Sequence, residues 1–330
     1  MSLIAIVKPD SAGSKEVVRP SPPLAVHLAL AGCCAVLLAV CVILPPRGAM
    51  STGLPLLEAT VLLLAPLLIV PAYFHERKSW ERRDAALMLP WTLVIAALVT
   101  QVAPTTVAHA FPLRDMLWRK LDEHLWINIP AIMTFTGNHP LLLSVLTFSY
   151  YWMLHPLLLS AIFLPACTGK RHASQQFVLA NAFAFVLAIP FMLLLPAIGP
   201  WTAWHFAPNP LQLACESSIH SLRLGGISSG DSFGGVICFP SFHVFWAVIS
   251  AHALRQFRLL RYPAILVAGF ITLSTMSTGW HYGVDVIAGL VLAWVCTGLA
   301  DVILRTENSA AKSVLLGQMP ETKVAGLDCP

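Results

Sequence analysis

The chain has 330 residues, of which 57% are hydrophobic and only 11% are charged, and its mean hydropathy is +0.74. This composition excludes an ordinary soluble globular domain and is typical of a polytopic membrane protein. The net charge of +4 is small, and the basic residues cluster in short loops between apolar runs, so the charge indicates membrane orientation and argues against nucleic-acid binding.

The chain begins with a stretch that does not resemble a membrane helix. Residues 1–23 combine charged residues with several prolines and predict a flexible tail, without the pattern of a cleaved signal peptide. Apolar runs long enough to cross about 30 Å of hydrocarbon follow. They lie at about residues 24–44, 54–74, 86–103, 141–163, 177–197, 237–254, 263–280 and 284–304.

These runs predict an all-α fold, a polytopic bundle of about eight transmembrane helices that forms one membrane domain over residues 24–304. Residues 305–330 are polar and predict a disordered C-terminal tail.

Basic residues mark three of the predicted loops. They are Arg77, Lys78, Arg82, Arg83, Lys170, Arg171, Arg255, Arg258 and Arg261. If eight helices cross the membrane, all three loops lie on one side, and the excess of Lys and Arg predicts that this side is the cytoplasm. Both termini are then cytoplasmic, and the longer loops 104–140 and 199–236 are extracytoplasmic.

One of these longer loops contains a predicted interfacial helix. Apolar residues at 113, 116, 117, 121 and 125, flanked by Trp118 and Trp126, give residues 113–128 an amphipathic pattern. Its basic residues Arg114, Arg119 and Lys120 are candidates for phosphate binding, although a charged surface is the simpler interpretation of each.

Two stretches carry the candidate chemistry, residues 238–243 and residues 274–285. His281 and Asp285 are four residues apart, so on a helix the carboxylate can accept a hydrogen bond from the imidazole. That bond fixes the tautomer and leaves the other ring nitrogen free as a nucleophile. His243 follows a Pro-Ser corner typical of a helix start, where its ring is free to act as an acid.

The spacing of the two stretches predicts that they meet. Residue number 281 minus 243 gives 38, and a round trip across the bilayer at 1.5 Å per residue needs about 20 residues each way. A His-x-x-x-Asp pair alone arises often by chance and by simple helix pairing. Its combination with a Pro-Ser-x-His corner one helical hairpin away favours a catalytic site.

The residues Pro240-Ser241-Phe242-His243, followed by Ser274, Gly279, His281, Asp285 and Gly289, resemble the second and third signature motifs of the type 2 phosphatidic acid phosphatase (PAP2) superfamily. The motif variant Phe-Pro-Ser-x-His is most similar to the one in the inositol phosphorylceramide synthase-like branch. The resemblance is good over about residues 199–304 and implies a PAP2-like catalytic core whose motifs span 238–289. It also implies that His281 attacks phosphorus, Asp285 activates it, and His243 protonates the leaving group.

The sequence departs from the family pattern at two places. Soluble-like members carry an arginine directly after the serine that matches Ser274, whereas this chain has Thr275, as in the synthase-like branch. The first family motif, Lys-x6-Arg-Pro, is absent, because Ala12 lies seven residues before Arg19. The residues that hold the phosphate are therefore unassigned. The substrate-binding candidates are Ser241, Ser274, Gly279 and, among the cations, Arg223.

We therefore expect an integral membrane enzyme that acts on a lipid phosphate ester through a phosphohistidine. If water is the acceptor, the protein is a lipid phosphatase; if an alcohol is the acceptor, it is a headgroup transferase of the inositol phosphorylceramide synthase kind. A non-catalytic lipid-binding or transport protein is the alternative from another class. No metal or other cofactor is expected, because both histidines have acid–base or nucleophilic roles. The oligomeric state stays open, as does a disulfide between Cys215 and Cys238.

Overall fold

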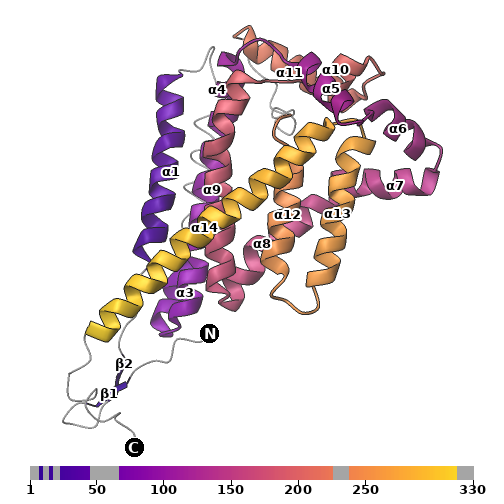
Figure 1. Ribbon diagram of the computed structural model, residues 1–330. Helices are drawn as coiled ribbons and strands as arrows, with labels where there is room; N and C mark the ends of the chain where they lie inside the picture. The colour runs from indigo at the N-terminus through magenta and orange to yellow at the C-terminus, as the bar shows by residue number, and fades with distance from the viewer. Residues whose placement is uncertain (1–6, 10–14, 18–22, 45–66, 226–237, 318–330) are drawn as a thin grey trace, which may run out of the picture.

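The structure is a computed structural model, and it describes residues 7–9, 15–17, 23–44, 67–225 and 238–317. It is predominantly helical, and the helices gather into an upright bundle with a layer of short helices across one end (Figure 1). In chain order they are α1 (Leu24–Ile43), a helical stretch at 67–76, α3 (Trp80–Ala86), α4 (Met88–His109), α5 (Asp115–His124), α6 (Ile129–Gly137), α7 (Pro140–Phe148), a π-helical turn η1 (Ser149–Met153), α8 (Leu154–Thr168), α9 (Arg171–Leu194), α10 (Pro200–Trp204), α11 (Pro210–Arg223), α12 (Phe242–Leu254), α13 (Arg261–Ser277) and α14 (Gly283–Gly317).

The centre of the bundle is α9. It packs against α1, α4, α8, α12 and α14, and 56% of its apolar stretch is buried, compared with 28–39% for the other long apolar helices. Small residues allow this close packing, as helix–helix contacts in a membrane require. Four alanines on α9 are completely buried: Ala180, Ala182, Ala184 and Ala188.

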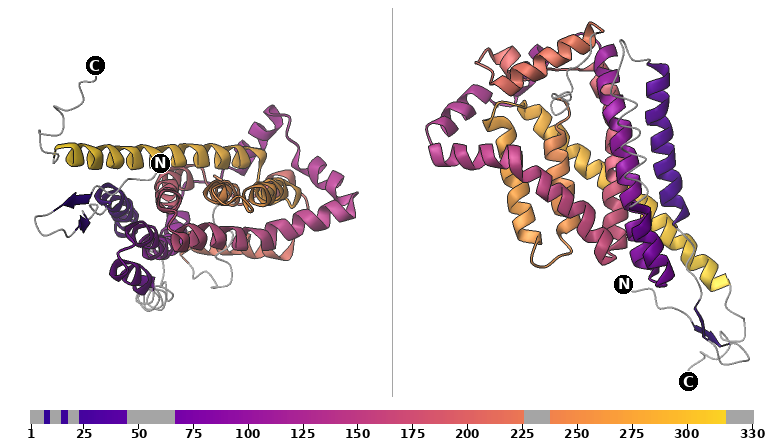
Figure 2. Two further views of the ribbon diagram at one scale, coloured as in Figure 1. Left: turned by 90° about the horizontal axis from the view of Figure 1, so that it is seen from below. Right: turned by 180° about the vertical axis from the view of Figure 1, so that it is seen from behind.

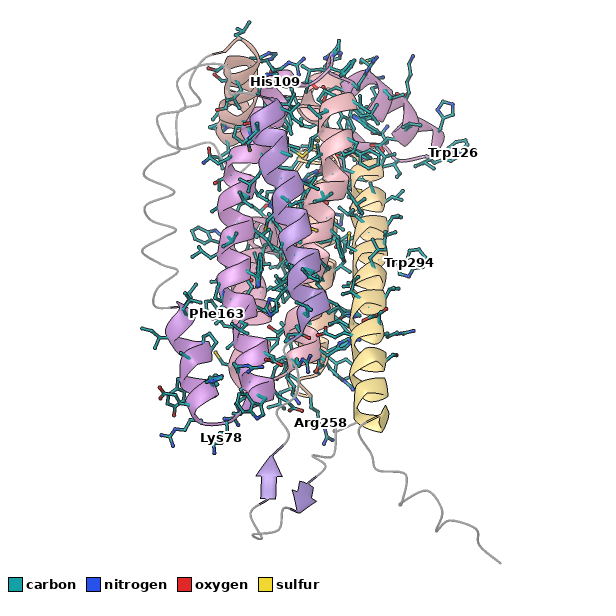
Figure 3. All side chains as sticks on the ribbon, turned by 90° about the vertical axis from the view of Figure 1, so that its left-hand side faces the viewer. Lys78, His109, Trp126, Phe163, Arg258 and Trp294 are labelled. Atoms are coloured by element: carbon teal, nitrogen blue, oxygen red, sulfur yellow. The ribbon has the colours of Figure 1, made fainter. Side chains whose placement is uncertain are left out.

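The outward faces of the bundle are apolar. Trp294 on α14 is 78% exposed and points away from the other helices (Figure 3). Large exposed apolar side chains of this kind are expected where lipid covers the protein. Together with the long apolar helices, they indicate an integral membrane protein.

The eight predicted spans are not confirmed. Within the described residues, five helical stretches are long and apolar enough to cross a membrane: Leu24–Ile43, Trp80–His109, Pro140–Thr168, Arg171–Leu194 and Gly283–Glu307. Much of the predicted span 54–74 lies outside the described residues.

The predicted spans 237–254 and 263–280 correspond to α12 and α13, which are shorter, with 13 and 17 residues. At 1.5 Å per residue α12 is about 20 Å long, less than the hydrocarbon core of about 30 Å. The prediction was too long because the apolar residues before Ser241 form a turn. Ser241 caps α12 by accepting a hydrogen bond from the backbone of Val244.

The structure describes a part of each of the two predicted tails. Val7–Pro9 (β1) and Lys15–Val17 (β2) pair as antiparallel strands, with Lys8 opposite Glu16, inside the predicted flexible tail. At the other end, α14 continues through Gly317, beyond the predicted boundary at 304. The prediction ended where apolar residues became sparse, but several of the residues that follow are good helix formers.

The two ends of the bundle differ in chemistry. Lys78 and Arg258 lie at one end, together with β1, β2 and the C-terminal end of α14, and His109 and Trp126 lie at the other (Figures 1 and 3). The α12–α13 connection is at the basic end, so the first turn of α12, the last turn of α13 and the first turn of α14 meet at the opposite end (Figure 1). Seen along the bundle, α12 and α13 stand between α14 and the stretch α7–α8 (Figure 2).

Candidate active site

The site lies where the start of α14 packs against the start of α12. The backbone N–H of Ser241 donates to the carbonyl oxygen of Asp285 over 3.2 Å. Gly289 allows this approach, because a Cβ at that position would lie 2.6 Å from the carbonyl oxygen of Ser241. The helix ends therefore hold the residues of the two predicted motifs against each other.

His281 is held by two acceptors. Its Nδ1 lies 3.1 Å from the carbonyl oxygen of Cys238 and 3.4 Å from Oδ2 of Asp285. A carbonyl oxygen only accepts, so Nδ1 carries the proton and Nε2 keeps its lone pair. Burial lowers the pKa of His281 to about 4, against the opposing effect of the Cys238 bond, so the ring is neutral at neutral pH.

Asp285 accepts from three donors through one oxygen. Besides His281, its Oδ2 accepts from the backbone N–H of Tyr282 at 2.9 Å and from the thiol of Cys238 at 3.2 Å. Burial is the main cause that raises the pKa of Cys238, and the carboxylate of Asp285 raises it further, so the sulfur keeps the proton that it donates. Cys238 lies in the first of the two candidate stretches, but no sequence pattern predicted its contact with Asp285.

His243 lies beside His281 on the first turn of α12. The two ring centroids are 5.8 Å apart and the rings are inclined by 59°, which agrees with the separation expected from a single hairpin. On its other face His243 stacks on Tyr150 of η1, with centroids 4.5 Å apart and an angle of 13°. Tyr150 thus fixes the plane of the His243 ring, a contact that no local sequence pattern indicated.

The other predicted substrate-binding residues are engaged in the scaffold. Ser241 caps α12, and the hydroxyl of buried Ser274 donates to the carbonyl oxygen of Ile271 at 2.6 Å. Gly279 has φ +71, and a Cβ there would lie 2.9 Å from Met133 and from Phe206. The turn before His281 therefore requires glycine. Roles in substrate binding stay predictions for these three residues.

Arg223 is the predicted cation that lies near the site. It lines a cavity of about 20 Å³ together with Cys238 and Phe239. One guanidinium nitrogen, Nη2, donates to the carbonyl oxygen of Phe111, and the other, Nη1, is buried without a partner among the described residues. Arg119 is used elsewhere, because it bonds to the carbonyl oxygen of Ala203 and to Glu123.

The side chains around His281 also have the composition of a metal-binding group. Cys238, His281 and Asp285 offer ligand atoms that all lie within 4.8 Å of one another. In this structure the three groups form hydrogen bonds among themselves, and a cation would have to displace the protons on sulfur and Nδ1. The sequence left a disulfide between Cys215 and Cys238 open, and in the structure these two residues are not bonded to each other.

An apolar pocket of about 370 Å³ begins at His243 and extends into the bundle. It is lined by α4, α8, α9 and α12, mostly with aliphatic and aromatic side chains such as Val99 and Phe177. The amide of Asn181 is occupied, since it accepts from the indole N–H of Trp246 and donates to the carbonyl of Phe177. The pocket therefore offers His243 at one end and apolar surface along its length.

A family model for the PAP2 superfamily matches residues 116–299, more than half of the chain. The chain belongs to the PAP2 superfamily. The match begins in α5 and is wider than the resemblance predicted from the motifs, and it includes every helix end that forms the site. PAP2 superfamily members are phosphoesterases or phosphotransferases, which gives the class of chemistry. Comparisons with curated proteins and with solved structures return no match, and the synthase-like branch stays a prediction.

Proposed function

We propose that this protein is a membrane enzyme that transfers a phosphoryl group from a lipid phosphate ester through a phosphohistidine on His281. The observation that carries the proposal is the environment of Nδ1, which donates to Cys238 and Asp285 and leaves Nε2 with its lone pair. A second ionisable ring, that of His243, lies close by, with its centroid 5.8 Å from that of His281, so one phosphate ester can contact both rings.

In the proposed reaction, Nε2 of His281 attacks phosphorus and forms the N–P bond while the ester P–O bond breaks. His243 first takes up the proton that a monoanionic phosphate ester carries, and the departing alkoxide then takes that proton from His243 and leaves as an alcohol. His243, now neutral, accepts a proton from water as the water oxygen attacks the phosphohistidine. The N–P bond breaks, and phosphate leaves with His243 protonated again.

Charge on the phosphate oxygens must be stabilised during transfer, since electrostatics supplies most of the catalysis in such reactions. Thr275, at the position where soluble-like relatives have an arginine, is buried, and its hydroxyl donates to the carbonyl of Thr272. We infer that the cation comes instead from Arg223, which reaches the cavity beside Cys238 and has one buried nitrogen without a partner among the described residues.

A lipid substrate is supported by the pocket that begins at His243. Its volume of about 370 Å³ is in the range of ligand sites, and its apolar lining suits a hydrocarbon chain. A chain lying between α4 and α9 would place the attached phosphate ester at the His243 end. The basic residues at the far end of the bundle support an orientation with that end in the cytoplasm and the site on the extracytoplasmic face.

Filling the pocket tests the lipid assignment. We expect Val99→Trp to raise the KM for a long-chain lipid phosphate about tenfold or more, because each CH₂ kept out of the pocket forfeits about 0.8 kcal/mol. Turnover of a soluble aryl phosphate should not change. Leu159→Trp is the matched control, since Leu159 is 52% exposed on the outer surface of α8. Equal effects on both substrates, or no effect on the long-chain one, would contradict the assignment.

The molecule that accepts the transferred group distinguishes the two enzymatic hypotheses, a lipid phosphatase and a headgroup transferase. The Phe-Pro-Ser-x-His motif variant and Thr275 favour the headgroup transferase. Hydrolysis, by contrast, needs only water as the acceptor. The test is to give purified protein phosphatidic acid and measure inorganic phosphate, and to give it an inositol phospholipid with ceramide and measure the transferred product, with His281→Ala as the blank. We expect one of these products to exceed the blank at least a hundredfold. If neither does, both of these substrate assignments are contradicted and the non-catalytic alternative is favoured.

A further inference from the structure

Helix α5 buries two carboxylates and one tryptophan against the protein and exposes its aliphatic residues. Asp115, Trp118 and Asp122 follow one another at intervals of three and four residues, so they share one face of the helix. All three are buried, with Asp122 completely so. The exposed apolar residues around the rest of the helix are Met116, Leu117, Leu121 and Leu125.

The buried face contacts the corner before α12 and the residue directly after His281. Trp118 stacks on Phe239 of the corner that precedes α12, with ring centroids 4.1 Å apart and an angle of 20°. Asp115 accepts from the hydroxyl of Tyr282 at 3.0 Å and also from the backbone N–H of Ile198 and of Gly199. The residue directly after His281 is therefore tied to α5.

Asp122 closes the same connection at the start of α14. Its Oδ2 accepts from the N–H of Gly283 and its Oδ1 from the N–H of Val284, both at 2.9 Å. These N–H groups belong to the first turn of α14, where a helix has no internal acceptor for them, and a negative charge there is favoured by the helix dipole.

The contact is tight. A Cβ on Gly283 would lie 2.5 Å from the side chain of Ile127 and 3.2 Å from the carboxylate of Asp122, so glycine permits the approach. Burial raises the pKa of Asp122 to about 6, and its two backbone bonds oppose this effect, so the carboxylate is ionised at neutral pH.

We propose that Asp122 is a positioning residue for the His281–Asp285 pair, which it aligns by fixing the first turn of α14 to α5. The inference rests on the proposed phosphohistidine function. Asp122 bonds to neither member of the pair. It acts through Gly283 and Val284, which lie between them, and so sets where Asp285 stands relative to the His281 ring.

The variants separate alignment from simple stabilisation. In Asp122→Asn one oxygen still accepts, but the amide NH₂ faces the second N–H, donor against donor. In Asp122→Ala both bonds are lost. Glu123→Gln is the matched control, because Glu123 is the next residue, is exposed, and pairs with Arg119.

Kinetics normalised to the folded fraction give the first readout. We expect kcat to fall about tenfold in Asp122→Asn and about a hundredfold in Asp122→Ala, with KM within twofold of wild type, because a displacement of about 1 Å in a catalytic group costs about that much. Glu123→Gln should match wild type. A purely structural role would lower the amount of folded protein and leave kcat per folded molecule unchanged, which would overturn the proposal. If Asp122→Ala does not fold, Asp122→Asn decides.

The second readout does not depend on activity. In ¹⁵N-histidine-labelled protein, the Nδ1–H proton of His281 should give a hydrogen-bonded NMR signal that shifts or broadens in the Asp122 variants and stays in place in Glu123→Gln. An unchanged signal would overturn the inference even if wild type proves inactive. A wild type that shows no turnover while the signal responds to Asp122 would refute the proposed function and leave the alignment supported.

Discussion

His281→Ala should form no phosphoenzyme and should lose on the order of 10⁴- to 10⁶-fold in kcat, as expected when a nucleophile is removed. His243→Ala should fail differently. Its loss on an alkyl phosphate should be about 10²- to 10⁴-fold, the contribution of a general acid. On an aryl phosphate, whose leaving group needs no proton, His243→Ala should still become phosphorylated.

This difference follows from the distinct surroundings of the two rings. Nδ1 of His281 is committed to Cys238 and Asp285, so the ring has one orientation and one free nitrogen. His243 has no carboxylate partner among the described residues and is held by stacking on Tyr150, next to the pocket. The first ring is arranged to attack, and the second to exchange protons.

The measurement is a quench during turnover of a ³²P-labelled substrate, followed by a search for an acid-labile, base-stable phosphate on the peptide that contains His281. The same quench on His243→Ala with a labelled aryl phosphate should give label on His281 that accumulates, because the second step is slowed as well. Label on His243 in wild type would reverse the two roles. An active preparation that never carries label would favour direct attack by the acceptor.

The sequence predicts those contacts in the site that join residues one helical turn or one helical hairpin apart. His281 and Asp285 come together because they are separated by one turn of chain, and His243 approaches them because one hairpin returns the chain to the same end. The contacts that the sequence did not reveal are made across long separations. Tyr150 stacks on a ring far along the chain, and the backbone of Cys238 holds His281 through an oxygen that every residue possesses.

Helix α5 illustrates a second limit. The apolar periodicity of residues 113–128 correctly predicts a helix, here Asp115–His124. In a soluble protein the apolar face would be the buried one. At a membrane surface lipid can cover that face, so the carboxylates Asp115 and Asp122 turn toward the protein and bind backbone N–H groups. Periodicity alone gives the two faces of such a helix but does not say which one the protein covers.

The eight predicted spans stay unconfirmed for a related reason. An apolar window measures composition and does not mark where the helix starts, so it joins the turn before Ser241 to α12. The cap at Ser241 and the glycine turn at Gly279 shorten both helices at the site end. These interruptions are also what bring the polar residues together, because helix ends release the backbone groups that hold His281 and Asp285.

Asp285→Asn should lower kcat by about 10²- to 10³-fold with little change in KM, the effect of removing one electrostatic stabiliser of the transition state. The amide oxygen can take the place of Oδ2 and still accept from Tyr282 and Cys238. The amide NH₂ then takes the place of Oδ1, which is buried and has no partner among the described residues. The shape of the site is kept while its negative charge is lost.

The expected loss is smaller than the roughly 10⁴-fold seen when an analogous change in a Ser-His-Asp triad gives the wrong tautomer. The carbonyl of Cys238 still holds the Nδ1 proton of His281 in Asp285→Asn, so the reactive tautomer persists. What is lost is the charge opposite the imidazolium that forms when His281 binds phosphorus. Phosphoenzyme formation, followed by rapid quench, should therefore slow as much as overall turnover does.

Cys238→Ala is the matched control for this argument. It removes the thiol that donates to Asp285 and keeps the backbone carbonyl that accepts from His281. The thiol is a weak donor, so its bond to the carboxylate contributes about 0.5–1.5 kcal/mol; the loss in kcat should be about two- to tenfold, and Cys238→Ser should restore most of it. If Asp285→Asn retained a third or more of wild-type kcat, the carboxylate would not be stabilising charge on His281, and the carbonyl of Cys238 alone would account for the orientation of the ring.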